Sequence, residues 1–287
     1  MRLRFVVPLC LCVSSLLMAQ ATKVWTPEEL FRRNIGTNEQ QVKQFPPHKI
    51  MGNIYYVGTE TLASFLITTP QGHILVNSMY ERTLPVIQDS VAKLGFKFSE
   101  IKIVLGSHAH GDHQEADAMI KDLTGAQVMA MAEDVPSLQA MRPGGKPQPV
   151  DRVLHDGDEV PLGGTTLVAH LTPGHTRGCT TWTLKAQEGG KTHDVVIIGS
   201  MGVNPGTALV NNKQIPAIAD EYKQGFKVLH SLPCDVPLGS HPAMFNIAEK
   251  FPKMGKGANP YIDPQGYKTE VETQEGAFKL KLEEQSK

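Results

Sequence analysis

The sequence lacks the features that would place it in several large classes of protein. Its charges nearly balance, with 28 Lys and Arg against 29 Asp and Glu, so nothing indicates the basic surface that nucleic-acid binding requires. It has only 4 cysteines in 287 residues, too few for a fold held together by disulfides. It contains no internal repeat, and beyond its first residues no apolar stretch is long enough to cross a membrane. These absences leave a globular chain, able to form one large domain with a sizeable core.

The first 19 residues have the pattern of a secretory signal peptide. Two arginines in the first four positions are followed by an almost wholly apolar stretch and by Ala19, a small residue suited to cleavage. The apolar stretch is too short to span a bilayer comfortably, which favours a signal peptide over an anchor. Ala21 is an alternative cleavage position, because Leu17 is not the small residue of an ideal site. We therefore expect a single domain over residues 20–287, exported to the periplasm without stable membrane association.

Apolar patterning predicts alternating strands and helices, with a turn at residues 70–72 and a Pro/Gly-rich loop at 142–150. The predicted strands cover residues 54–57, 63–67, 73–76, 101–105, 127–131, 166–171, 180–185, 195–198 and 235–238. The predicted helices cover residues 84–94, 116–123, 215–231 and 264–284. Many strands with interspersed helices fit an α/β fold, with two mixed sheets between helical layers in a four-layer αββα sandwich.

The segment HAHGDH places four candidate metal ligands, His108, His110, Asp112 and His113, directly after a predicted buried strand. In an extended segment, residues two apart point the same way, so His108 and His110 can reach one metal. Asp112 and His113 lie beyond Gly111 and can turn toward a neighbouring position. Imidazole and carboxylate ligands suit zinc, and also iron or manganese. Two metals held about 3.5–4 Å apart can share a water and lower its pKa toward neutrality.

Two later histidines follow predicted strands in the same way. His175 comes after a Thr-Pro-Gly turn, and His241 comes after Leu-Gly-Ser. With the first four residues they make six ligands, three for each of two metals, with open positions for water and substrate. His170 is near the site in sequence, on a strand that can face either way, so a supporting role for it is an open alternative. The remaining histidines lie in ordinary surroundings and are predicted to be structural: His48, His73, His155, His193 and His230.

These motifs carry a resemblance to a known family. HAHGDH resembles the His-x-His-x-Asp-His signature of the metallo-β-lactamase superfamily. LTPGHTRGCTTW and LPCDVPLGSHPAMF resemble the segments that carry its later metal ligands. The signature is shared by many hydrolases. The flanking segments LASFLITTPQGHILVNS, KLGFKFSEIKIVLGSHAHGDH and NPYIDPQGY are more specific, and they resemble class B β-lactamases of the third subclass.

The resemblance implies a reaction and a role for each ligand. It implies that a first zinc ion is held by His108, His110 and His175. It implies that a second zinc ion is held by Asp112, His113 and His241. The implied reaction is hydrolysis of the β-lactam amide bond by a zinc-bound hydroxide that Asp112 orients, which inactivates the antibiotic. The partner would be a small β-lactam; the resemblance says nothing of the oligomeric state.

The residue at position 200 distinguishes the β-lactamase interpretation from its alternatives. Glyoxalase-like and lactonase-like relatives usually place a metal-bridging Asp where this chain has Ser200, and β-lactamases lack that Asp. The runner-up is another hydrolase of the same superfamily, acting on a thioester, lactone or ester. A metal-binding protein without catalysis ranks lower, because six ligands with open positions are unlike the closed four-ligand cages of structural sites.

The sequence departs from the family pattern where the substrate should bind. Third-subclass enzymes commonly place small hydroxyl residues at the positions of Met201 and Val203, and often a Tyr at that of Thr207. Apolar side chains cannot hydrogen-bond a carboxylate. We expect the substrate to lie against Met201, with Ser200 or Asn204 supplying a polar contact.

Two cysteines, Cys179 and Cys234, remain beyond the predicted signal peptide. Spacing alone does not decide whether they are paired. The cysteine that often pairs with Cys234 in relatives has no counterpart here, which favours a free Cys234.

Overall fold

The computed structural model describes residues 23–287, so the predicted signal peptide lies outside the described residues. The strands form two sheets, one with the order β1-β2-β3-β4-β5-β6-β7 and one with the order β12-β11-β10-β9-β8. The first sheet contains β1 (His48–Met51), β2 (Ile54–Tyr56), β3 (Phe65–Thr69), β4 (Gly72–Val76), β5 (Ile101–Leu105), β6 (Gln127–Met131) and β7 (Arg152–Leu154). The second contains β8 (Glu159–Leu162), β9 (Thr165–Leu171), β10 (Thr180–Glu188), β11 (Lys191–Ile198) and β12 (Val236–Gly239).

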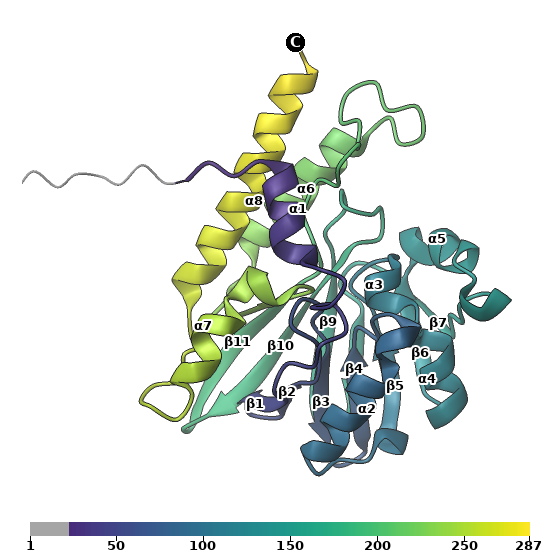
Figure 1. Ribbon diagram of the computed structural model, residues 1–287, viewed down its shortest axis with the longest axis vertical. Helices are drawn as coiled ribbons and strands as arrows, with labels where there is room; N and C mark the ends of the chain where they lie inside the picture. Colours follow the sequence, from purple (N-terminus) through teal and green to yellow (C-terminus); the bar gives the residue numbers. More distant parts are fainter. Residues whose placement is uncertain (1–22) are drawn as a thin grey trace, which may run out of the picture.

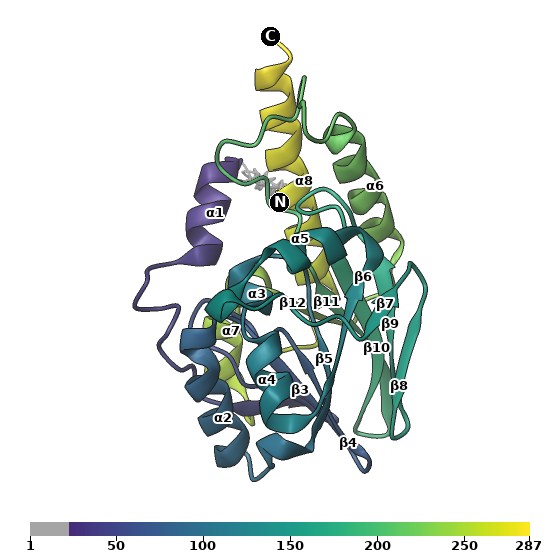
Figure 2. The same cartoon turned by 90° about the vertical axis from the view of Figure 1, so that its right-hand side faces the viewer.

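Helices lie on the outer side of each sheet. The α-helices are α1 (Pro27–Ile35), α2 (Leu84–Lys93), α3 (Gly111–Gln114), α4 (Asp117–Thr124), α5 (Val135–Ala140), α6 (Ile218–Ser231), α7 (Ile247–Lys250) and α8 (Pro264–Gln285). Helices α2 and α4 cover the first sheet, whereas α6 and α8 pack on the second (Figures 1 and 2). From residue 23 onward, no helix combines the length and apolar character needed to cross a membrane.

Both sheets are mixed. Strands β1 to β4 pair antiparallel and β4 to β7 pair parallel, while in the second sheet only β11 and β12 are parallel. The predicted αββα sandwich of two mixed sheets between helical layers is thereby confirmed.

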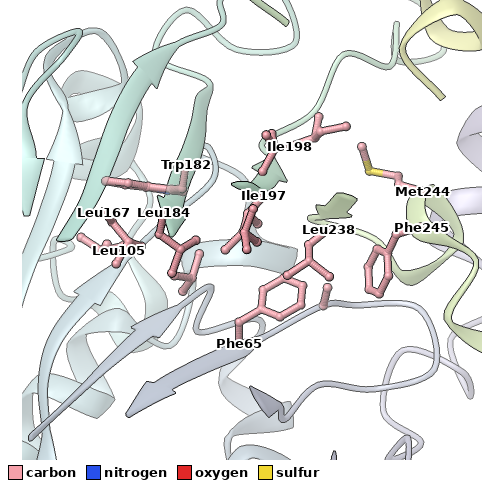
Figure 3. Close-up of a cluster of buried hydrophobic side chains, with 14 of the residues drawn as sticks. Phe65, Leu105, Leu167, Trp182, Leu184, Ile197, Ile198, Leu238, Met244 and Phe245 are labelled. Carbon is pink, nitrogen blue, oxygen red and sulfur yellow. The ribbon is translucent and has the colours of Figure 1, made fainter. Parts of the chain in front are cut away.

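The first sheet is buried on both faces because its side chains alternate between two cores. On β3, Phe65 and Ile67 point into the core between the sheets, and Leu66 points into the core under α2 and α4. Figure 3 shows Phe65 meeting Ile197 and Leu238 of the second sheet. Burying each such side chain contributes about 1.5–3 kcal/mol, which fixes the spacing and register of the sheets.

Several predicted boundaries differ from those of the structure. Helix α6 begins at Ile218 rather than at 215, because the Asn212 side chain accepts the N–H groups of Gln214 and Ile215 in a turn. Strands β10 and β11 are longer than predicted and form a hairpin with a turn at Gly189-Gly190. Their outer halves contain charged residues, so the apolar pattern did not predict them. Strands β1, β7 and β8 were not predicted, because each has only three or four residues, too few to show a pattern.

Helix α1 also had no counterpart in the sequence-based prediction. Its start is fixed by a capping box, in which the Thr26 hydroxyl accepts the Glu29 N–H and the Glu29 carboxylate accepts the Thr26 N–H. Its end is tied to α8, since the Arg33 guanidinium donates to the buried Glu270 carboxylate at 2.9 Å. The ion pair holds α1 against α8, and α1 also contacts residues 242–245, which follow β12.

Candidate metal centre

The candidate ligands lie where strands of both sheets end. Residues 106–110 leave the end of β5, residues 172–175 leave β9, and His241 follows β12. Backbone hydrogen bonds join these segments: Thr180 N–H donates to Ser107 at 2.7 Å, and Ala63 N–H donates to Ser240 at 3.0 Å. The two sheets therefore bring together ligands that are far apart in the sequence.

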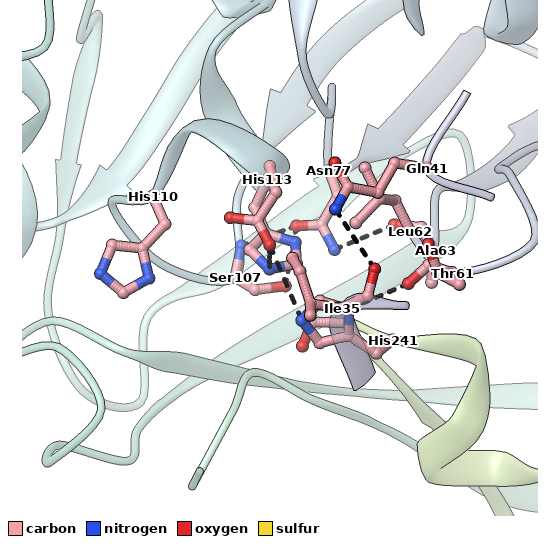
Figure 4. Close-up of polar contacts among 12 residues, drawn as sticks. Ile35, Gln41, Thr61, Leu62, Ala63, Asn77, Ser107, His110, His113 and His241 are labelled. Carbon is pink, nitrogen blue, oxygen red and sulfur yellow. Dashed lines mark hydrogen bonds and ion pairs between the residues drawn. The ribbon is translucent and has the colours of Figure 1, made fainter. Parts of the chain in front are cut away.

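All six predicted ligands meet in one cluster with His108 at its centre. The His108 ring centroid lies 4.8 Å from that of His110, 4.5 Å from that of His175 and 4.2 Å from that of His113. Ligand atoms of His108, His110 and His175 lie within 4.8 Å of one another, and so do those of His108, Asp112 and His113. His241 joins the second group, with its Nε2 3.8 Å from Asp112 Oδ2. Figure 4 shows His113 and His241 close together, with His110 lying apart from both.

Two carbonyl groups fix which nitrogen of the late histidines faces the centre. His175 Nδ1 lies 2.6 Å from the Gly202 carbonyl oxygen, and His241 Nδ1 lies 2.9 Å from that of Thr61. A carbonyl only accepts, so each Nδ1 carries the hydrogen and each Nε2 keeps its lone pair. Such a backbone partner is the usual support of a metal-ligating imidazole.

The burial of the ligands favours a cation. Both ring nitrogens of His108 and of His113 are buried without a hydrogen-bond partner among the described residues. Leaving such a group unpaired costs about 1–3 kcal/mol, which coordination to a metal would offset. Burial lowers the pKa of His108 well below its usual value, that of His175 to about 3 and that of His241 to about 4. These imidazoles are therefore neutral at pH 7, as metal binding requires.

Asp112 supplies the negative charge of the cluster. Burial acts to raise the pKa of its carboxyl, but the neighbouring His113 and His241 outweigh burial, and the pKa lies below its usual range. Its Oδ2 lies 3.2 Å from His113 Nε2. An ionised carboxylate among neutral imidazoles has the charge and the donor atoms that zinc binds.

Asn77 and Asp134 support the ligand segments and were missed by the sequence analysis. Asn77 Oδ1 accepts both the N–H and the hydroxyl of Ser107, at 2.8 and 2.7 Å, which fixes the corner before His108. The buried Asp134 carboxylate accepts Ala109 N–H, the Thr176 hydroxyl and Gly178 N–H, each at 2.8 Å. Both residues follow buried strands, β4 and β6, as the first ligands do. That placement was the signal available in the sequence.

Asp117, the first residue of α4, is a buried carboxyl group whose titration should affect stability. Burial raises the pKa of its carboxyl to about 7 from a usual 3.8, and its Oδ1 has no partner among the described residues. The folded protein therefore holds this proton more tightly than the unfolded chain, and the stability it contributes is lost as pH rises from about 4 through 7. Asp117→Asn should remove this loss. We compare the free energy of unfolding of the variant with that of the parent. The difference, variant minus parent, should increase by about 1.4 kcal/mol or more between pH 5 and pH 8.

Urea unfolding of both chelator-treated proteins at the two pH values measures this gain. Because the other titrating groups are common to both proteins, they cancel in the difference. Parallel pH profiles for parent and variant would show that Asp117 is ionised throughout the range.

Two of the three residues predicted to contact the substrate are buried. Ser200 is 3% exposed and Met201 is 1% exposed, with Met201 packed in the main core against Gly225. This burial does not favour contact between either side chain and a substrate. Asn204 is partly exposed, and its contact stays a prediction.

The remaining histidines and the cysteines are accounted for elsewhere. His170 Nε2 lies 2.8 Å from Thr183 Oγ1, on the neighbouring strand, rather than beside a ligand. The other five pair outside the centre: His48 with Tyr261, His73 with Glu100, His155 with Asp158, His193 with Asp235 and His230 with Glu275. Cys179 and Cys234 are both free, so the preferred reading of Cys234 is confirmed.

An αββα sandwich with a cluster of five histidines and one aspartate at its strand ends has the make-up of a metal-dependent hydrolase. A family model described as the metallo-beta-lactamase superfamily matches residues 58–235, and the chain belongs to that superfamily.

Two solved structures show which members of the superfamily this chain resembles. The native metallo-β-lactamase FEZ-1 from Legionella gormanii is 50% identical, with a TM-score of 0.82 over 85% of this chain and 98% of that one. BJP-1, a subclass B3 metallo-β-lactamase of Bradyrhizobium japonicum, is 36% identical, with a TM-score of 0.80 over 86% and 97% of the two chains. The resemblance to the third subclass is thus confirmed.

A curated relative has a different name. A hydroxyacylglutathione hydrolase of Fuscovulum blasticum is 34% identical over 94 residues, which are 33% of this chain and 32% of that enzyme. This match spans only about a third of either protein.

Proposed function

We propose that this protein is a dizinc β-lactamase, which hydrolyses the amide bond of the β-lactam ring and so inactivates the antibiotic. The observation that carries the proposal is the six-residue His/Asp cluster, in a chain that is 50% identical to a metallo-β-lactamase along 98% of that enzyme. One zinc ion would be held by His108, His110 and His175. The other would be held by Asp112, His113 and His241.

The residues of the cluster suit this chemistry. Zinc ions bound here would supply a water of lowered pKa and a Lewis acid for the substrate carbonyl. Asp112 is ionised at neutral pH and lies between His113 and His241, so its carboxylate can orient a water and hold a proton taken from it. The Gly202 and Thr61 carbonyls keep Nε2 of His175 and His241 available as ligands. Asn77 and Asp134 hold the ligand loops in place before substrate binds.

The alternative within the superfamily is thioester hydrolysis, which the partial match to a hydroxyacylglutathione hydrolase supports. The residue at position 200 argues against it. Ser200 offers no carboxylate where such relatives usually carry a bridging Asp.

The experiment compares substrates under one set of conditions. Zinc-loaded enzyme should hydrolyse a chromogenic cephalosporin, a penicillin and a carbapenem with kcat/KM of about 10⁴ M⁻¹s⁻¹ or more, and should contain two zinc ions per chain. Treatment with a chelator should abolish turnover, and added zinc should restore it. Faster hydrolysis of a glutathione thioester or a lactone than of any β-lactam would contradict the proposal. Bound metal without hydrolysis of any substrate would identify a metal-binding protein instead.

We also propose that the enzyme acts in the periplasm, on the basis of the signal-peptide pattern in residues 1–19. Protein for these assays can be recovered from the periplasm of cells that express the full chain. A mature mass beginning at Gln20 or Thr22 would agree with this location. A protein that kept residues 1–19 and stayed in the cytoplasm would not.

A further inference from the structure

Helix α6 packs directly against the turn that precedes His175. A Cβ atom on Gly225, within α6, would lie 2.5 Å from the Pro173 carbonyl oxygen, too close for a real side chain. A Cβ atom on Gly174, in the turn itself, would lie 2.6 Å from Cγ of Tyr222. The two glycines therefore allow helix and turn to touch, and the Tyr222 ring covers the residue next to the ligand.

The hydroxyl of Tyr222 reaches the backbone group that orients His175. It donates to the Gly202 carbonyl oxygen at 3.0 Å. His175 Nδ1 donates to the same oxygen at 2.6 Å. A carbonyl oxygen has two lone pairs, so it can accept both hydrogen bonds. Tyr222 thus acts on the ligand at two points, through the preceding glycine and through the shared carbonyl.

The Tyr222 side chain is itself held in one place. It is 1% exposed, and its ring stacks on Phe278 of α8 with the ring centroids 5.1 Å apart and the planes at 22°. Burial raises the pKa of its hydroxyl, which therefore stays protonated and can donate. A rigid, buried donor of this kind can fix the position of the group that accepts from it.

The Gly202 carbonyl lies in a segment that has no regular structure to position it. Residues 199–204 follow β11 and belong to no helix or strand, so their placement depends on contacts with the surrounding elements. Met201 packs on Gly225 of α6, and Gly202 accepts from Tyr222 of the same helix. Helix α6 therefore positions both the turn before His175 and the carbonyl that orients its ring.

We propose that Tyr222 is a positioning residue for the first metal, which holds the Gly202 carbonyl where it orients His175. The proposal rests on the metal centre of the proposed function and concerns a residue that is not itself a ligand. Groups that orient a ligating imidazole typically change metal affinity by about 10- to 100-fold, and we expect the low end, because Tyr222 acts through one further group. His241 is oriented by a different carbonyl, that of Thr61, so the second metal should be unaffected.

The test is Tyr222→Phe, which removes the hydroxyl and keeps the stacked ring. Zinc affinity, measured by competition with a chromophoric chelator, should fall about tenfold at one of the two sites and stay unchanged at the other. In proton NMR spectra of the zinc-loaded protein, the Nδ1–H signal of His175 is identified by its absence in His175→Ala. This signal should shift in Tyr222→Phe, whereas that of His241 should stay in place.

Tyr267→Phe is the matched control. Tyr267 is 5% exposed on α8, and its hydroxyl donates to the Leu229 carbonyl of α6 at 2.7 Å. Each substitution removes one buried hydroxyl that bonds a backbone carbonyl, so both should lower the urea midpoint of unfolding by a similar amount. The Leu229 carbonyl orients no ligand, so Tyr267→Phe should keep the zinc affinity and the His175 signal of the parent.

The outcomes separate positioning from general stability. Unchanged zinc affinity with an unchanged His175 signal in Tyr222→Phe would overturn the proposal. An equal loss of zinc affinity in both variants would overturn it as well, because the effect would then follow the stability of α6 alone. None of these readouts requires turnover. A parent protein that binds zinc but hydrolyses no β-lactam would contradict the proposed function and leave the role of Tyr222 in place.

Discussion

Replacing His110 by alanine should lower kcat/KM for β-lactams about a thousandfold or more, because a lost metal removes several kcal/mol of transition-state stabilisation and each 1.4 kcal/mol is tenfold. The fold should survive the substitution. His110 is partly exposed and is the extended residue that precedes α3. Its Nδ1 lies 3.2 Å from His175 Nε2. Asp112→Ala should reduce activity to a similar extent by removing the only carboxylate of the six predicted ligands.

Zinc content and thermal unfolding, measured beside kcat/KM, distinguish a lost ligand from a lost fold. Each variant should bind less zinc than the parent and should retain a cooperative unfolding transition. His170→Ala is the matched control, since it removes a half-buried histidine that contacts Thr183 outside the cluster, and it should keep parental activity. Near-normal turnover in His110→Ala or Asp112→Ala would remove the proposed centre.

Replacing Asp134 by alanine should destabilise the protein by about 3 kcal/mol, since three donors lose their acceptor at roughly 1 kcal/mol each. The carboxylate is 2% exposed, so water cannot readily take its place. It accepts a hydrogen bond from Ala109, which lies between His108 and His110. It also accepts hydrogen bonds from Thr176 and Gly178, which follow His175. Zinc affinity and kcat should therefore fall by about 10- to 100-fold, as is typical for groups that orient metal ligands.

Urea unfolding gives the stability, and zinc titration with kinetics gives the effect on the centre. Asp134→Asn should be intermediate, because its amide keeps one accepting oxygen. Asp151→Ala is the control: that aspartate also accepts a backbone N–H, from Val128 at 2.8 Å, but it is exposed and holds no ligand loop. A loss of stability in Asp134→Ala without any change in zinc affinity would show that Asp134 supports the fold alone.

The ligands were predictable because their signal is local. Four of them lie within six residues after a buried strand, and His175 and His241 each follow a strand end. The strands 101–105 and 127–131 were predicted at their observed bounds, because an apolar run marks a buried parallel strand wherever it occurs. Edge strands such as β8 and the helix α1 carry no such run, so local patterning did not reveal them.

The sequence by itself determined the kind of chemistry: HAHGDH, His175 and His241 are candidate metal ligands by residue type and spacing. Only the tertiary structure decided what surrounds them. Met201 lies at a position expected to bind substrate, yet it is buried under α6. Asp134 joins two ligand loops of which one lies 25 residues before it and the other 44 residues after it in the sequence. Such contacts depend on how two sheets pack together, and long-range packing leaves no periodicity in the sequence around any one residue.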